Sequence, residues 1–247
     1  MEDLIKLDKN QIIKDNNKKG GSPLLVLGLI RNDISDLIYL HDLFIKDSVD
    51  VKNLVNSRSG QYAGRKIYVI RLILSHYYEF LVFLDKKKKE ISSDDQLKKI
   101  FKILNKDDLE LWNHFISLSS QIEDKKIKTT DKNINTELKV ALLAKSIRGG
   151  LTFHYWHASV HINKGFKTAF TDDEENSNNK FPYATEERSV YKDRAYYIDL
   201  SMQKYLEKEV SLNEDIFLFE KSIVNTISNV NLILNKILNN YHKNISL

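Results

Sequence analysis

The chain has 247 residues, enough for one sizeable domain with a buried core. It contains only 8 glycines and 2 prolines, too few for the frequent turns of a β-sandwich or barrel, so we expect an all-α fold of long helices. The absence of cysteine excludes disulfides, thiolate nucleophiles, iron–sulfur clusters and cysteine-ligated zinc sites. A net charge of +4 is a weak basic bias and gives only slight support to nucleic-acid binding.

The N-terminal residues 1–22 are polar and end in Lys-Lys-Gly-Gly-Ser, which predicts a loosely ordered lead-in before a single helical domain over 23–247. Acidic residues stand where a secretory signal peptide needs basic ones, and no apolar stretch follows. We therefore expect a cytoplasmic protein without a membrane anchor.

Apolar residues then recur at helical spacing. Pro23 suits the first turn of a helix predicted to end near Lys46, and a second helix spans roughly 61–86. That helix is apolar around most of its circumference, and the charged residues within it favour a buried central helix over a membrane span. A capping cluster at 92–95 predicts a third helix that ends near Leu104, and a fourth helix begins at 105–108. Two more helices are predicted, from Thr136 to Ile147 and over about 212–242. Between these two, an acidic loop insert is predicted near 171–180.

Chemistry-bearing residues concentrate in 146–161, directly after the apolar helix that ends at Ile147. On an unbroken helix, Arg148 and His154 would lie about 120° apart in projection and roughly 9 Å apart along the axis, too far to share one substrate atom. The adjacent Gly149 and Gly150 predict a break, because each costs a helix interior about 1 kcal/mol relative to alanine. Either a kink at the glycines brings the pair together, or two chains of a dimer complete one site.

His154, His157 and His161 offer a competing site, since their spacing places them on one helical face. Three imidazoles suit Zn²⁺, but the first and last lie about 10 Å apart along a helix, and zinc–nitrogen bonds are only about 2.1 Å long. A metal site here therefore reduces to a histidine pair. We expect neither a metal nor a cofactor, and a metal-dependent hydrolase is the weakest of the interpretations.

The segment Ser-Ile-Arg-Gly-Gly-Leu-Thr-Phe-His-Tyr, residues 146–155, resembles the motif segment of HEPN-domain proteins. In many of those proteins an apolar helix runs into an arginine, a short spacer and then Phe-His-Tyr. Gly149 stands where they usually carry a polar residue. Weaker similarity covers 31–37 on the first long helix, and also Gln61 and Tyr62, which lead into the helix that carries Glu79.

The resemblance implies a HEPN-like helical bundle and a metal-independent endoribonuclease that is active as a homodimer. In such an enzyme the RNA 2′-OH attacks the adjacent phosphate. His154 would be the general base or acid, and Arg148 would bind the phosphate and stabilise the transition state. The supporting candidates are Asn32, Asp33, Glu79, Tyr155 and His157.

The same resemblance suggests a toxin or a phage-defence effector whose partners are RNA, a second copy, and an antitoxin or regulatory protein. The alternative is a non-catalytic HEPN-like helical protein that binds a nucleotide, RNA or a protein. Under that alternative Arg148 caps a helix C-terminus, and His154 is a buried histidine that ties two helices together.

Overall fold

The structure, a computed structural model, describes residues 23–50, 59–123, 127, 134–148, 164, 205 and 216–245. This part of the chain is all-α: it forms seven helices and no strand, which confirms the predicted fold class. The lead-in 1–22 and the acidic insert 171–180 lie outside the described residues. The division of the chain into a lead-in and one domain therefore stays a prediction.

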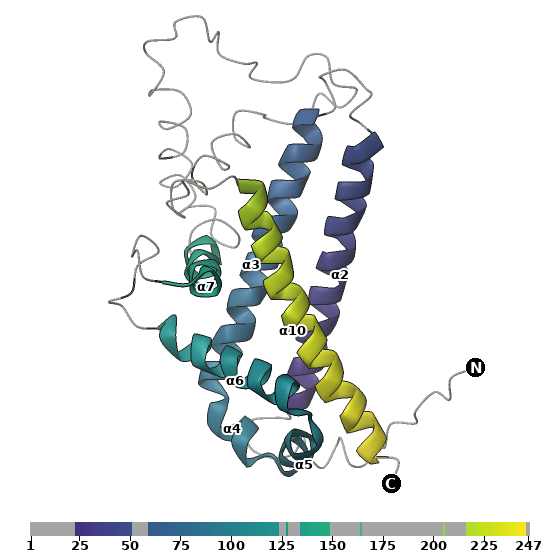
Figure 1. Cartoon of the computed structure of the whole chain (residues 1–247), viewed down its shortest axis with the longest axis vertical. Coiled ribbons are helices and arrows are strands. Elements are labelled where there is room, and N and C mark those ends of the chain that lie inside the picture. Colours follow the sequence, from purple (N-terminus) through teal and green to yellow (C-terminus); the bar gives the residue numbers. More distant parts are fainter. Residues whose placement is uncertain are drawn as a thin grey trace, which may run out of the picture.

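Three long helices form the body of the described structure: α2 (Pro23–Asp50), α3 (Ser59–Lys86) and α10 (Ile216–Ile245) (Figure 1). The middle one, α3, packs against α2, α6, α7 and α10. Its part Ile67–Lys86 is long and apolar enough to cross a membrane, but 56% of it is buried inside the protein. In the described structure this segment is the central helix of the bundle, as its all-round apolar pattern predicts.

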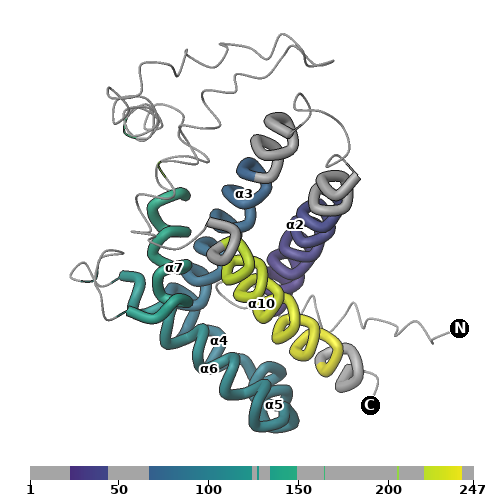
Figure 2. Tube along the Cα trace, turned by 45° about the horizontal axis from the view of Figure 1, so that its top comes forward, coloured from purple at the N-terminus to yellow at the C-terminus, as the bar shows by residue number. Residues whose placement is uncertain are grey.

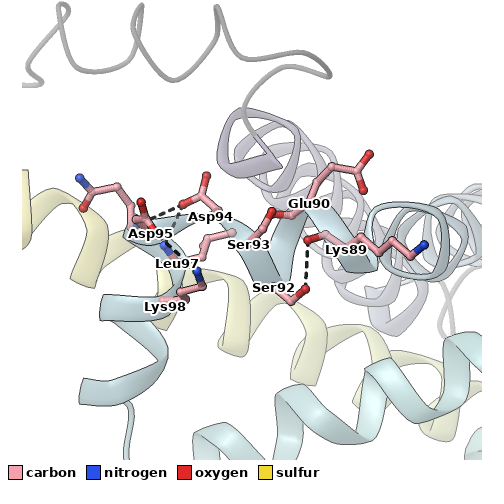
Figure 3. A network of polar contacts seen from close by, with 9 residues as sticks. Lys89, Glu90, Ser92, Ser93, Asp94, Asp95, Leu97 and Lys98 are labelled. Atoms are coloured by element: carbon pink, nitrogen blue, oxygen red, sulfur yellow. Dashed lines mark hydrogen bonds and ion pairs between the residues drawn. The ribbon is translucent and has the colours of Figure 1, made fainter.

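Four shorter helices pack around the lower end and one side of the body: α4 (Lys88–Ser93), α5 (Asp95–Ile103), α6 (Lys106–Gln121) and α7 (Thr136–Ile147) (Figures 1 and 2). Each of the last three begins behind a side-chain cap. Asp94 accepts hydrogen bonds from the Gln96 and Leu97 amides at 3.0 and 2.9 Å (Figure 3). Asn105 and Asn135 cap α6 and α7 in the same way. The predicted cap within 92–95 and the predicted helix start at 105–108 are thus confirmed.

Two helices end later than predicted, and one short helix is additional. The first helix runs on to Asp50, and the last, Ile216–Ile245, ends later than the predicted residue 242, while its predicted first residues, 212–215, lie outside the described residues. The short helix α4 is an element that the sequence does not predict, because it buries one apolar residue, Ile91, and so shows no apolar period. The lysine run 86–89 consequently spans a junction between two helices, with Lys86 at the end of α3.

A single cluster of buried apolar side chains runs through all seven helices. Phe115 of α6 belongs to this cluster, with its ring edge-on to Phe80 and Tyr77 of α3 at centroid distances of 5.6 and 6.4 Å. The largest fully buried side chains are Tyr77, Tyr205, Phe80, Phe115, Leu27 and Ile34.

Polar contacts fix α10 alongside α2. Residue numbers rise along α2 as they fall along α10, so the two helices run antiparallel. The contacts are Arg31 Nε to Asn235 Oδ1 at 2.7 Å, Ser35 Oγ to Asn231 Oδ1 at 3.0 Å, and His41 Nε2 to Glu220 Oε1 at 2.9 Å.

Tyr77→Phe is expected to stabilise the protein by about 1 kcal/mol, because it removes a buried hydroxyl that loses its water on folding. Tyr77 is 1% exposed, and its hydroxyl has no hydrogen-bond partner within the described part of the chain. Burial raises the pKa of this phenol well above its ordinary value of 10.0. The folded state therefore keeps the proton while the unfolded state loses it, and stability falls as pH rises above about 10.

Urea unfolding at pH 7 and at several pH values above 10 tests both parts of this prediction. The Tyr77→Phe variant should be more stable at pH 7 and should lose less stability in alkali. A variant less stable than the wild type at pH 7 would mean that the hydroxyl makes a stabilising bond.

Candidate functional site

Arg148 of the predicted catalytic pair is held between two helices. It follows the last residue of α7 in right-handed helical conformation, with φ −59° and ψ −45°, and its amide donates to the carbonyls of Ala144 and Lys145. Its Nε donates to Oε1 of Glu79 on α3 at 2.5 Å. The chain is therefore still helical at Arg148, and the predicted break at Gly149–Gly150 lies outside the described residues. Two site candidates 69 residues apart in the sequence meet here.

A second acid–base pair lies one helical turn away. His76 stands three residues before Glu79 on α3, so the two occupy neighbouring positions on one face. Its Nδ1 is 3.6 Å from Oδ2 of Asp33 on α2. The four side chains Asp33, His76, Glu79 and Arg148, here called the polar strip, are 33–45% exposed, so a solute can reach them.

The polar strip crosses three helices. In both views α2 and α7 lie on opposite sides of α3 (Figures 1 and 2), and the strip runs from α2 over α3 to the end of α7. It contains two carboxylates, one guanidinium and one imidazole. A guanidinium whose Nε is bound by a carboxylate is held in one orientation, and an arginine fork can bind phosphate oxygens. Imidazole is the side chain that most often transfers protons in enzymes.

A neighbouring cluster holds the end of α7 in place. Tyr78 of α3 donates to Oε1 of Glu123 at 3.4 Å, and Lys145 of α7 lies 3.8 Å from the same oxygen. Lys145 also donates to the carbonyl of Ile122 at 2.5 Å. Burial, and then the Glu123 carboxylate, raise the pKa of Tyr78, while the charge of Arg148 opposes this effect. These contacts connect α3, α6 and α7 around Arg148.

The structure places only some of the predicted site residues. Asp33, Glu79 and Arg148 join the polar strip. Asn32 is exposed on α2, and its Oδ1 accepts a hydrogen bond from the neighbouring Arg31 at 3.1 Å rather than joining the strip. His154, Tyr155 and His157 lie outside the described residues, and so does the competing histidine triplet.

His76 is a member of the strip that the sequence does not predict. The only signal for it in the sequence is its distance of three residues from Glu79 on one helix, a spacing that many surface pairs share. Its connection to Asp33 depends on how α2 packs against α3, which no local pattern reveals.

Within the described residues, no group of three or more His, Asp or Glu side chains is placed to hold a metal ion. The histidines of 154–161 lie outside those residues, and the metal site there stays a hypothesis.

No protein-family model, curated protein or solved structure matches the chain.

Proposed function

We propose that the protein is a HEPN-like, metal-independent endoribonuclease that acts as a cytoplasmic homodimer, with Arg148 and His154 as its catalytic residues. The observation that carries the proposal is the contact between Arg148 and Glu79. It joins the motif arginine to Glu79, a distant acidic residue among the supporting candidates, and it does so on an accessible surface beside a histidine–aspartate pair.

The proposed reaction needs no group from outside the chain and the RNA. A base takes the proton of the ribose 2′-OH, and the 2′-oxygen forms a bond to the adjacent phosphorus. The bond from phosphorus to the 5′-oxygen breaks, and an acid protonates that oxygen. The products are a 2′,3′-cyclic phosphate and a 5′-OH. Arg148 balances the added negative charge on the phosphoryl oxygens in the transition state.

Two proton transfers require two proton carriers, and histidine is suited to both. His154 is one of them in this proposal. The place of His76 in the polar strip, one turn from Glu79 and beside Asp33, supports it as the second. Asp33, whose Oδ2 lies 3.6 Å from His76 Nδ1, would then help to orient the imidazole.

Glu79 is a positioning residue in this scheme, because it acts through Arg148. Glu79→Ala is expected to lower the rate of RNA cleavage about 10- to 100-fold, since a misplaced guanidinium no longer meets the transition state. Glu79→Gln keeps an oxygen that can accept from Arg148 Nε and should lose less activity. The stability of both variants should stay within about 1 kcal/mol of wild type, because the pair is half-exposed.

Glu137→Ala is the matched control for Glu79→Ala. Glu137 forms a similar half-exposed pair, 2.7 Å from His114 Nε2, at the other end of α7. Its loss should leave cleavage unchanged. Initial rates on a single-stranded oligoribonucleotide, with thermal unfolding of each variant, check the prediction. Equal losses of activity in the Glu79 and Glu137 variants would contradict a positioning role.

A second function is favoured by one feature of the same contact. The Glu79 carboxylate partly neutralises Arg148 and ties α7 to α3, as a purely structural contact would. In that case the protein is a non-catalytic HEPN-like protein that binds RNA, a nucleotide or a protein partner. It would bind RNA without cleaving it, and Glu79→Ala would change stability rather than any rate.

The biological role that we propose with the first function is that of a toxin or a phage-defence effector. Such a nuclease requires restraint in the healthy cell, for which an antitoxin or regulatory protein is the proposed partner.

A further inference from the structure

The outer face of α2 is apolar and exposed. Its other faces pack against α3 and α10, and α2 lies at the edge of the bundle in both views (Figures 1 and 2). Six large apolar side chains on this face are 36–64% exposed. Exposed apolar side chains that are grouped in this way mark interaction surfaces, whereas single ones are common on any protein. They are Leu25, Val26, Leu29, Tyr39, Leu40 and Leu43.

The exposed positions follow the spacing of a coiled-coil seam. Positions 25, 29, 32, 36, 39 and 43 are all exposed and alternate in steps of four and three residues, which is the heptad pattern of one helix packing along another. This set is called the outer seam. Apolar residues occupy its two ends, and Asn32 and Asp36 occupy its middle.

The outer seam is complementary to itself when two copies run antiparallel. With the two-fold axis at position 34, Leu25 faces the partner's Leu43, Leu29 faces the partner's Tyr39, and Asn32 faces the partner's Asp36. Every layer then joins apolar to apolar or polar to polar. A parallel pairing in register would instead place Asp36 against the partner's Asp36, a repulsive contact.

The polar layer is also oriented for this pairing. Asn32 Oδ1 already accepts a hydrogen bond from Arg31 Nη1, so the NH₂ group of the same amide serves as the donor. A donor at position 32 matches a carboxylate at position 36 of an antiparallel partner. On one flank of the seam, the exposed Val26 and Leu40 approach the partner's Leu40 and Val26 in the same arrangement.

We propose that the protein forms a homodimer in which the outer seams of two α2 helices pair antiparallel about a two-fold axis at position 34. An interface of this kind uses the same patch on both copies, as a two-fold dimer requires. The inference does not depend on RNA cleavage.

The pairing has a consequence for the polar strip. Asp33 lies beside position 34 on the flank of α2 that faces α3 and His76. A two-fold axis perpendicular to both helices keeps this flank on the same side of the dimer in each copy. The Asp33 ends of the two polar strips therefore lie on one face of the dimer, while the two Arg148 side chains, at the other ends of the strips, lie beyond α3 and away from the interface (Figures 1 and 2).

Measuring whether the protein is a monomer or a dimer tests the proposed interface through the outer seam. Sedimentation of the full chain should give twice the 28.9 kDa mass of one copy. Leu29→Glu should raise the dimer dissociation constant at least about 100-fold, because it buries a charge in both halves of the interface. Ile103→Glu, a matched change at a 56% exposed apolar residue on α5, should leave the dimer intact. A monomeric wild type at micromolar concentration, or equal effects of the two variants, would overturn the proposal.

Disulfide cross-linking tests the register, since the chain has no cysteine of its own. The double variant Leu29→Cys/Tyr39→Cys, or a mixture of the two single variants, should form a covalent dimer on oxidation. Leu29→Cys alone should not, because the two copies of residue 29 lie about 15 Å apart along the helix axes, beyond the reach of a disulfide. Efficient cross-linking of Leu29→Cys alone would indicate parallel pairing and would refute the register.

These outcomes are separate from those of the cleavage assay. A cross-linked dimer that leaves RNA intact supports this inference and refutes the nuclease proposal. RNA cleavage by a monomer would refute this inference and the dimeric form of the nuclease proposal, while the cleavage activity itself would stand.

Discussion

His41→Leu is expected to lower the free energy of unfolding by about 3–5 kcal/mol, the range for removing one partner of a buried polar pair. His41 is 2% exposed and Glu220 is 8% exposed, and their side chains meet at 2.9 Å between Nε2 and Oε1. The leucine would leave the Glu220 carboxylate buried without the imidazole that it contacts. The pair links α2 to the beginning of α10, so its loss should also loosen the packing of those two helices.

A double-mutant cycle checks this prediction. His41→Leu/Glu220→Leu replaces both members by apolar side chains of similar volume, and its stability should lie well above that of His41→Leu alone. Urea unfolding measures the free energy of unfolding of the wild type, the two single variants and the double variant, which are the four values that the cycle needs. A double variant at least as unstable as the two single changes combined would show that the contact between His41 and Glu220 is not the source of the loss.

Arg148→Ala is expected to lower the rate of RNA cleavage by about 100- to 1,000-fold, the usual cost of removing one donor that stabilises transition-state charge. Arg148→Lys keeps the charge but not the planar fork or the Nε contact with Glu79, so it should restore only part of the rate. Lys139→Ala, which removes one positive charge from the same helix, serves as the control and should retain full activity. Loss of activity in the Lys139 variant would indicate a general charge effect instead.

The predicted helices agree with the structure where the signal is local. Asp94 and Asn105 stand directly before apolar periodic segments, and both cap the helix that follows. The apolar spacing predicts a helix over Thr136–Ile147, and α7 has these bounds. Such features depend on a few consecutive residues, so the sequence is enough to predict them. The short helix α4 gives no comparable signal because it buries only Ile91.

The polar strip could not be predicted from the sequence, because its contacts join residues far apart in the chain. The motif points to Arg148, but the contact of Arg148 with Glu79 depends on the packing of α7 against α3. His76 escapes prediction for the same reason, since its contact with Asp33 depends on the packing of α2 against α3. Sequence patterns indicate which face of a helix is buried and leave open which neighbour covers it.

The two ways in which Arg148 and His154 could share one site are also more sharply defined. Because Arg148 keeps helical φ and ψ angles, a kink between the pair must begin at Gly149 or later. A dimer through the outer seam of α2 brings the Asp33 ends of the two polar strips to one face but keeps the two Arg148 side chains beyond α3, so a site built from Arg148 and His154 relies on the kink within each chain.

Cleavage of a single-stranded oligoribonucleotide in EDTA, with chemical identification of the new ends, tests the nuclease proposal most directly. We predict 2′,3′-cyclic phosphate and 5′-OH ends from the wild type, and a loss of cleavage in both Arg148→Ala and His154→Ala. Three results would each contradict the proposal: an intact RNA, cleavage that EDTA abolishes and zinc restores, or cleavage that persists in both variants.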